Sequence, residues 1–399
     1  MTTSLQSFFL AINAGSSSVK FALYRGASLE LVLSGKIDRI GVSGTVLSFT
    51  RVTENGNETT ETHVDVLNHT VAVSVLLNAI ELHVNLSAIS AVGHRVVHGM
   101  DYQTHQRITP EVLEELRRIV PFAPEHLPQE IAIILALAAR RPELVQVACF
   151  DTVFHHTLPL VAQTLPLPKR FAAQGLRRYG FHGLSYEYLL EELSKVAGDE
   201  IVRGKVILAH MGNGVSMTAC RGGESVDTSM GLTPLSGLPM STRTGDLDPG
   251  AILAIMRDGN LSSDELAHLL NHESGLLGIS GLSSNMQDIL EAEHRDERAH
   301  LAADYFCYHA KKYIGAYAAV LDGLDTLVFS GGMGENSAPI RARVCSSLSY
   351  LGIEIDEDAN EKNELVISKE GSRVRVYVIP TNEELMIART AQKISDILN

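Results

Sequence analysis

The chain has 399 residues, of which 45% are hydrophobic and 20% are charged, as in ordinary soluble globular proteins. This length predicts two domains, or possibly three. The formal net charge of −14 argues against nucleic acid or an anionic membrane surface as the main partner, although a local basic pocket can still bind an anionic substrate.

The cysteines and the N-terminus indicate a cytoplasmic protein. Cys149, Cys220, Cys307 and Cys345 are far apart and form no C-x-x-C pair, so we expect reduced, buried thiols. The first ten residues lack the basic start of a signal peptide. The most apolar helical segment, 131–139, is too short to span a bilayer.

Three apolar runs predict buried strands that end in turns rich in glycine or serine. The runs are Phe8–Ile12, Val206–Ala209 and Leu327–Ser330. After the first two turns a second apolar run leads to Arg-Gly, at Arg25 and again at Arg221. This weak repeat predicts two related halves that each open with a hairpin, with two unrelated hairpins as the alternative.

Helices are predicted between these landmarks, at 110–119, 263–270, 299–321 and 384–398. The first of them begins with a proline followed by acidic residues, a good N-terminal pattern. Strands and helices mixed along the whole chain predict an α/β architecture.

Three small-residue turns could bind phosphate or nucleotide. In 13–20, small residues let backbone N–H groups approach phosphate oxygens, and hydroxyls and Lys20 add donors. The segment 210–216 contains two glycines and an asparagine that could expose amides to an anion. The segment 331–336 has Rossmann-like glycines with the spacing G-x-G-x-x-S. Each of the three could also be a plain structural turn.

Charged side chains beside apolar runs form a further set of candidates. They are Arg95, Asp151, His182, Arg243 and Glu383. Burying such a group unpaired is costly, so each has either a ligand or a structural partner. Glu383 could stabilise a helix start or reach Mg²⁺.

Taken together and in this order, the motifs resemble the acetate kinase family of acetate, propionate and butyrate kinases, from Asn13 to Glu383. The family belongs to the sugar kinase, Hsp70 and actin superfamily. The resemblance implies two duplicated actin-like (ribonuclease H-like) α/β domains with a nucleotide cleft between them. We place the N-terminal domain at 1–151 plus 385–399 and the C-terminal domain at 152–384.

The resemblance implies a role for each motif. Asn13 and Glu383 would hold Mg²⁺ or Mn²⁺, and Arg95, Asp151, His182 and Arg243 would be the catalytic residues. The acyl and carboxylate site would comprise Arg95, Val97, His126, Phe181 and Pro234. The nucleotide and its phosphates would contact Ser16, Ser18, Lys20, His210, Met211, Gly212, Asn213, Gly214, Asn285, Met286, Gln287, Gly332, Met333, Gly334, Glu335 and Asn336.

The implied reaction is the reversible, Mg²⁺-dependent transfer of a phosphoryl group from ATP to acetate, giving acetyl phosphate and ADP by direct in-line transfer. The family further implies a cytoplasmic homodimer with a place in acetyl-CoA biosynthesis. Because a carboxylate is already ionised at pH 7, the reaction needs no strong base, and we expect Asp151 to orient its neighbours instead of moving a proton.

The sequence departs from the family pattern in four places, which involve five positions. Glu125 stands where leucine is usual, near the acyl site, and Ser241 replaces a glycine. Asn285 and Gln287 replace the two charges of a D-x-R motif, and Met333 replaces an isoleucine. We therefore expect intact catalysis with altered nucleotide preference. The alternatives are a propionate or butyrate kinase, a family member with another phosphoryl donor, and an actin- or Hsp70-like protein that is not an enzyme.

Overall fold

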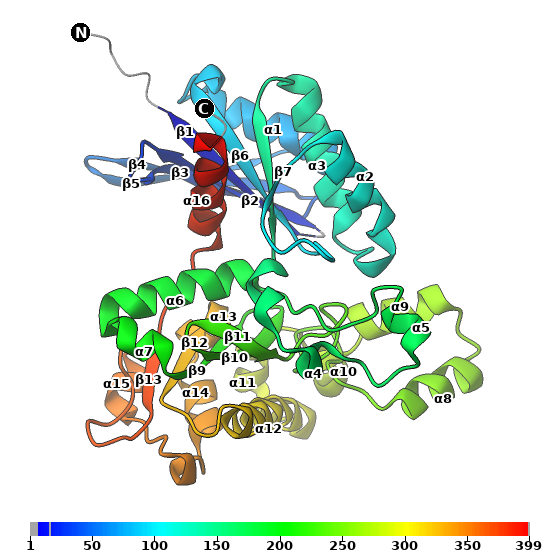
Figure 1. Cartoon of the computed structure of the whole chain (residues 1–399), viewed down its shortest axis with the longest axis vertical. Helices are drawn as coiled ribbons and strands as arrows, with labels where there is room; N and C mark the ends of the chain where they lie inside the picture. Colours follow the sequence, from blue (N-terminus) through cyan, green and yellow to red (C-terminus); the bar gives the residue numbers. More distant parts are fainter. Residues whose placement is uncertain (1–6, 16, 398–399) are drawn as a thin grey trace. The chain divides into compact units, whose positions relative to one another are not determined.

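The computed structural model describes residues 7–15 and 17–397 (Figure 1). Ser16, a predicted phosphate contact, lies outside the described residues.

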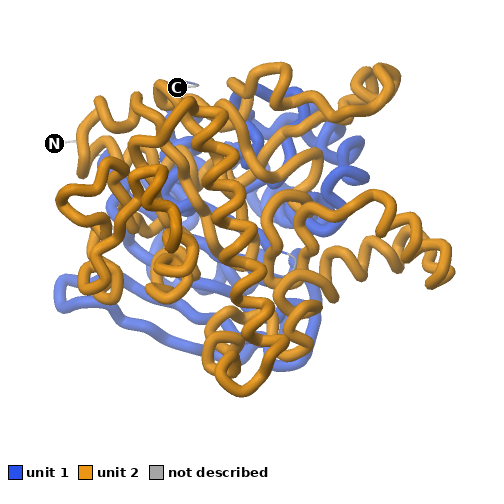
Figure 2. The backbone as a smooth tube through the Cα atoms, turned by 90° about the horizontal axis from the view of Figure 1, so that it is seen from below, with its two compact units in different colours: residues 1–153, 382–399 blue, residues 154–381 orange. Residues whose placement is uncertain are grey.

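The chain divides into two compact units (Figure 2). Unit 1 comprises residues 1–153 and 382–399, and unit 2 comprises residues 154–381. These borders lie two and three residues from the predicted ones, 151/152 and 384/385. The two predicted domains, as independently folding parts, stay a prediction.

Unit 1 is an eight-stranded sheet with four helices. Its elements are β1 (Phe8–Ala14), β2 (Ser18–Arg25), β3 (Glu30–Asp38), β4 (Val46–Thr53), β5 (Gly56–His63), α1 (His69–Glu81), β6 (Ile89–Val96), β7 (Gln106–Arg107), α2 (Pro110–Arg118), α3 (Leu127–Arg140), β8 (Val145–Phe150) and α16 (Glu383–Asp396).

Unit 2 is a five-stranded sheet surrounded by helices. Its elements are α4 (Leu160–Gln163), α5 (Lys169–Ala172), α6 (Gly183–Ala197), α7 (Asp199–Arg203), β9 (Lys205–Met211), β10 (Val215–Arg221), β11 (Glu224–Thr228), α8 (Pro249–Gly259), α9 (Ser263–His272), α10 (Gly275–Ser280), α11 (Met286–Ala292), α12 (Glu297–Val320), β12 (Thr326–Ser330), α13 (Gly331–Asn336), α14 (Ala338–Cys345), α15 (Glu357–Glu361) and β13 (Arg375–Val378).

The two sheets share one topology. Unit 1 contains the order β3-β2-β1-β6-β8, and unit 2 has the order β11-β10-β9-β12-β13. In each, the first three strands pair antiparallel and the last two add in parallel. The predicted α/β fold with two duplicated halves is therefore confirmed, and the hairpins β1–β2 and β9–β10 are the repeat seen in the sequence.

In both units the central strands are buried on both faces, which explains their continuous apolar runs. In unit 1, alternate residues of β1 (Phe8, Leu10, Ile12) pack with α1 and α3 in one hydrophobic cluster. Helix α16 packs against β1, β6 and β8. In unit 2, α6 packs on β9, β10 and β12.

All four predicted helices are present, as α2, α9, α12 and α16, with ends that differ by at most two residues. The four cysteines are buried and form no disulfide. Among residues 7–15 and 17–397, no helix has both the length and the apolar character to cross a membrane.

Helix α16 lies so close to β6 that a glycine is required between them. A Cβ added at Gly93 would lie 2.7 Å from the backbone oxygen of Ile387 and 2.5 Å from its side chain. Because backbone cannot give way as a flexible side chain does, β6 and α16 would have to separate.

We therefore expect Gly93→Ala to destabilise the protein by about 1–3 kcal/mol, the usual cost of overpacking a core. The measurement is the thermal unfolding midpoint. Gly371→Ala is the matched control, because a Cβ added there meets nothing within 4 Å. Equal midpoints for the two variants would contradict the prediction.

Candidate active site

A buried ion pair lies at the carboxyl ends of two parallel strands in unit 1. Arg95 is the second-to-last residue of β6, and Asp151 directly follows β8. The Arg95 Nε and Nη2 groups donate to Asp151 at 3.0 and 2.6 Å, and the Asp151 side chain is fully buried. Burial opposes the charge on Arg95, but the carboxylates of Asp151 and Glu383 raise its pKa above the usual value. The guanidinium is thus a fixed, permanent cation.

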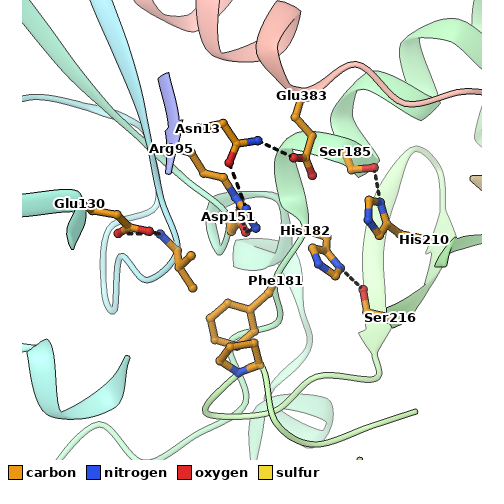
Figure 3. Close-up of polar contacts among 12 residues, drawn as sticks. Asn13, Arg95, Glu130, Asp151, Phe181, His182, Ser185, His210, Ser216 and Glu383 are labelled. Carbon is orange, nitrogen blue, oxygen red and sulfur yellow. Dashed lines mark hydrogen bonds and ion pairs between the residues drawn. The ribbon is translucent and has the colours of Figure 1, made fainter. Parts of the chain in front are cut away.

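Asn13 joins this pair to the start of α16 (Figure 3). Its Oδ1 accepts from Arg95 Nη1 at 3.2 Å, and its Nδ2 donates to Glu383 at 2.9 Å and Glu384 at 3.2 Å. Asn13 is the residue before the last in β1, so β1, β6 and β8 all end at this cluster. The predicted residues Asn13, Arg95, Asp151 and Glu383 are therefore brought together.

The acidic side of this cluster fits Mg²⁺, which prefers one or two carboxylates completed by water and substrate phosphates. Glu383 and its neighbour Glu384 supply the carboxylates. The Asn13 oxygen accepts one bond from Arg95 and has a second lone pair, so Asn13 stays a predicted ligand of the ion and also orients Glu383. In the described part of the chain, no group of three or more His, Cys, Asp and Glu side chains could hold a metal on its own.

Two stacked histidines form the corresponding cluster in unit 2. The rings of His182 and His210 lie 4.2 Å apart. His182 Nδ1 lies 2.8 Å from Ser216 Oγ, which also bonds Tyr186, and His210 Nδ1 lies 2.9 Å from Ser185 Oγ (Figure 3). These bonds fix the orientation of both rings.

The turn between β9 and β10 lies against His182 and Arg243. A Cβ added at Gly214 would come within 3.2 Å of His182 Nε2 and 3.6 Å of Arg243 Nη1. Arg243 Nη1 donates to the Pro234 carbonyl at 3.1 Å. The structure thus brings His182, Arg243, Pro234 and the predicted phosphate turn 210–214 together.

The glycine segment after β12 passes close to the same turn. Gly331 has a φ of +74°, and a Cβ there would lie 2.7–2.9 Å from the backbone of Met211 and Gly212. The Glu335 carboxylate accepts from the backbone N–H groups of Gly331 (2.8 Å) and Thr381 (3.1 Å). Glu335 therefore connects the segment after β12 with the segment around Thr381. A Cβ added at Gly332 would meet nothing within 4 Å, which leaves room for a ligand there.

The remaining predicted nucleotide segment starts α11. Asn285 caps this helix by accepting from the Gln287 N–H at 3.0 Å, Gln287 donates to Glu291, and the Met286 side chain is buried. A pocket of about 560 Å³ adjoins them. It is lined by Leu282, Ser283, Asp288, Glu291, Ala292, Arg295 and Asp296.

The other predicted residues lie in unit 1, apart from Phe181, which lies in unit 2. Lys20 is exposed and pairs in register with Asn13 across the β1–β2 hairpin, and Ser18 starts β2. Val97 directly follows β6, and His126 is the N-cap of α3. Phe181 belongs to unit 2 and is buried beside His182.

Glu130, on the first turn of α3, was missed from the sequence. Its side chain is buried, and both of its oxygens lie 3.3 Å from the Val97 N–H. Burial raises the pKa of Glu130 to about 8, although Arg95 and the Val97 N–H act in the opposite direction. The sequence did indicate that Glu130 is buried, because it shares the apolar helix face of Leu127, Ile131 and Ile134.

Arg341, on α14, was also missed. It is fully buried, and its Nη1 donates to the carbonyls of Gly334 (2.9 Å) and Glu335 (3.0 Å), while its Nε and Nη2 donate to Asn360. Burial lowers the pKa of Arg341 to about 10, so the group stays charged at pH 7. This side chain holds the end of α13 in place.

Comparisons with known proteins agree along the whole chain. A family model described as the Acetokinase family matches residues 8–389. The acetate kinase of Heliobacterium modesticaldum is 43% identical over 394 residues, which is 96% of this chain and 98% of that protein. The structures of Porphyromonas gingivalis acetate kinase (38% identical, TM-score 0.87) and a Francisella tularensis propionate kinase (36%, 0.90) each cover 97% of this chain and 99% of the other.

The contacts of Arg341 predict that Arg341→Lys is strongly destabilising, by about 2 kcal/mol or more, since one ammonium cannot reach the oxygens that a guanidinium spans. Chemical denaturation measures the loss. Arg373→Lys is the control, because Arg373 is exposed and donates to the Leu351 carbonyl. A loss no larger than that of the control would contradict the inferred role.

Proposed function

The chain belongs to the acetokinase family, and we propose that it transfers a phosphoryl group reversibly between ATP and acetate, giving acetyl phosphate and ADP. The chain is a phosphotransferase with a carboxyl group as acceptor. The observation that carries the proposal is the Arg95 guanidinium, held by Asp151 and joined through Asn13 to Glu383.

The chemistry of the step explains why this set of groups suffices. Phosphoryl transfer spreads charge over the equatorial oxygens, so the catalyst mainly positions and neutralises. A carboxylate acceptor is ionised at pH 7 and needs no base. We propose that Arg95 holds the acceptor, and that Arg243 and the Nε2 of His182 stabilise the phosphoryl oxygens. Direct in-line transfer requires no protein nucleophile.

The proposed role of Asp151 is to hold the Arg95 guanidinium in the orientation that binds the carboxylate. Both of its oxygens accept from Arg95, which supports this role over proton transfer. Glu383, with Glu384, is the proposed carboxylate pair for Mg²⁺ or Mn²⁺. When bound, that ion neutralises phosphate charge.

The proposed nucleotide site uses 210–214 for the phosphates and Gly332–Asn336 for the adenosine. The open surface at Gly332 supports this assignment, because a flat base or ribose can approach the backbone there. At 285–287, Asn285 caps a helix and Gln287 pairs with Glu291. No cation comes from those two positions, which supports the proposal of an altered phosphoryl-donor preference.

The second candidate is a propionate or butyrate kinase, which the similarity to the Francisella propionate kinase supports. One methylene changes the free energy of binding by only about 1–3 kcal/mol, so a small change in Val97, Phe181 or Pro234 could shift the preferred acid. We further propose a cytoplasmic homodimer that serves acetyl-CoA biosynthesis, as the family resemblance implies. Light scattering would test the dimer.

The decisive experiment is a hydroxamate trap for acyl phosphate with ATP, Mg²⁺ and each of acetate, propionate and butyrate. The proposal expects acyl phosphate with the highest kcat/KM for acetate. A higher value for propionate or butyrate would favour the second candidate. ATP hydrolysis without acyl phosphate would overturn the function.

Asp151→Asn is expected to lower turnover by about 100-fold or more, comparable to removal of one charge-stabilising donor in other enzymes. Hydroxamate formation gives the turnover, and a circular dichroism spectrum verifies the fold. Asp38→Asn is the control, because Asp38 pairs with Lys36 at the surface. Near-normal turnover of the Asp151 variant would refute the role.

Donor preference provides a further prediction. Titrations with ATP, GTP and pyrophosphate should show a smaller preference for ATP, measured by kcat/KM, than a protein with D-x-R at 285–287 would show. Replacing Asn285 and Gln287 with Asp and Arg should restore that bias, measured as the ratio of kcat/KM values. Strict ATP preference in the unmodified protein would contradict the prediction.

A further inference from the structure

A second buried carboxyl group lies behind the proposed acceptor site of unit 1. Glu130 is on the first turn of α3, with 2% of its surface exposed. Figure 3 shows its carboxyl group pointing toward the backbone next to Arg95. A buried acid without a cation bonded to it is unusual, because its charge costs much free energy in a protein interior.

The contact of Glu130 fixes one particular peptide. Each carboxyl oxygen lies 3.3 Å from the Val97 N–H, just beyond the end of β6. Arg95, the proposed anchor of the carboxylate, and Val97, a proposed wall for the acyl group, are separated by one residue. Moving the Val97 peptide would therefore change the distance between the anchor and the wall.

The charged groups around Glu130 determine its protonation state while it holds the Val97 peptide. Arg95 and Asp151 are the charged groups that act on it, and Arg95 is already paired with Asp151. His98, next to Val97, accepts the Met100 N–H through Nδ1, so that nitrogen carries no proton. His126 lies one turn before Glu130, at the start of α3. With a pKa of about 8, Glu130 is mostly neutral at pH 7 and adds no second negative charge beside Arg95.

We propose that Glu130 is a positioning residue for the acceptor acid. It sets the separation between Arg95 and Val97, and it does not compete with the substrate carboxylate for the positive charge of Arg95. This inference rests on the proposed function, since it concerns the same acceptor site. We expect the larger effect on the carboxylic acid, because the proposed nucleotide site at 210–214 and 332–336 belongs to unit 2, whereas Glu130 and Val97 belong to unit 1.

The test compares Glu130→Leu and Glu130→Gln with the unmodified full-length protein. Leucine removes the acceptor for the Val97 N–H, while glutamine keeps one acceptor oxygen and cannot ionise. For each protein, KM for acetate, KM for ATP, kcat and the acetate-to-propionate ratio of kcat/KM are measured by hydroxamate formation. Ile133→Val is the control, because Ile133 lies in the hydrophobic cluster of unit 1 on the same helix.

For Glu130→Leu we expect KM for acetate to rise about tenfold, as when one buried hydrogen bond is lost, with a shifted acetate-to-propionate ratio and an unchanged KM for ATP. Glutamine should restore most of this loss. Above pH 8 the unmodified protein should bind acetate progressively less well as Glu130 ionises, and Glu130→Gln should remove that rise in KM.

A purely structural role would lower the unfolding midpoint, as we expect for Ile133→Val, without changing these KM values and ratios. Unchanged acetate KM and acid preference in Glu130→Leu would overturn the proposal. If that variant does not fold, the pH profile of Glu130→Gln decides, and a profile identical to that of the unmodified protein overturns it. Failure of the unmodified protein to form any acyl phosphate would instead refute the function.

Discussion

The buried pair of Arg95 and Asp151 is the constraint around which the proposed acceptor half of the site is organised. A guanidinium at the end of a central strand has to be neutralised, and the parallel pairing of β6 with β8 places a carboxylate beside it. Once Asp151 occupies one edge of Arg95, Nη1 is directed to Asn13, and Asn13 in turn orients Glu383. The order of strands in the sheet therefore determines which polar groups meet, although these residues lie far apart in the sequence.

The sequence predicted the regular parts of the fold because local signals and burial agree there. Continuous apolar runs gave β1, β9 and β12, and the Pro110 start gave α2. The repeated hairpin indicated duplication, which the equal strand orders confirm. Asn13, Arg95 and Asp151 meet because each lies at the end of a central strand, and Glu383 joins them because it starts α16. Their chemical roles stay predictions.

The sequence could not show contacts that depend on how helices pack against the sheet. The apolar face that Glu130 shares on α3 indicated burial, but only the packing of α3 brings its carboxyl group to Val97. Arg341 reads as a surface arginine, yet it is enclosed by α13 and α15. Asn285 was interpreted as a lost charge at a ligand site, and the structure adds a structural reason for it, since it caps α11. Glu125 was considered as the acid at the acyl site, whereas Glu130 is the one bonded to Val97.

Helix α16 belongs to unit 1 although it follows all of unit 2 along the chain. The Asn13–Glu383 bond spans 370 residues. During synthesis, the sheet of unit 1 therefore emerges long before the helix that covers β1, β6 and β8. The apolar face around Gly93 stays uncovered until the ribosome has completed unit 2. The sheet of unit 1 is thus exposed to chaperones and to aggregation until α16 is synthesised. The proposed acceptor half of the site is complete only then.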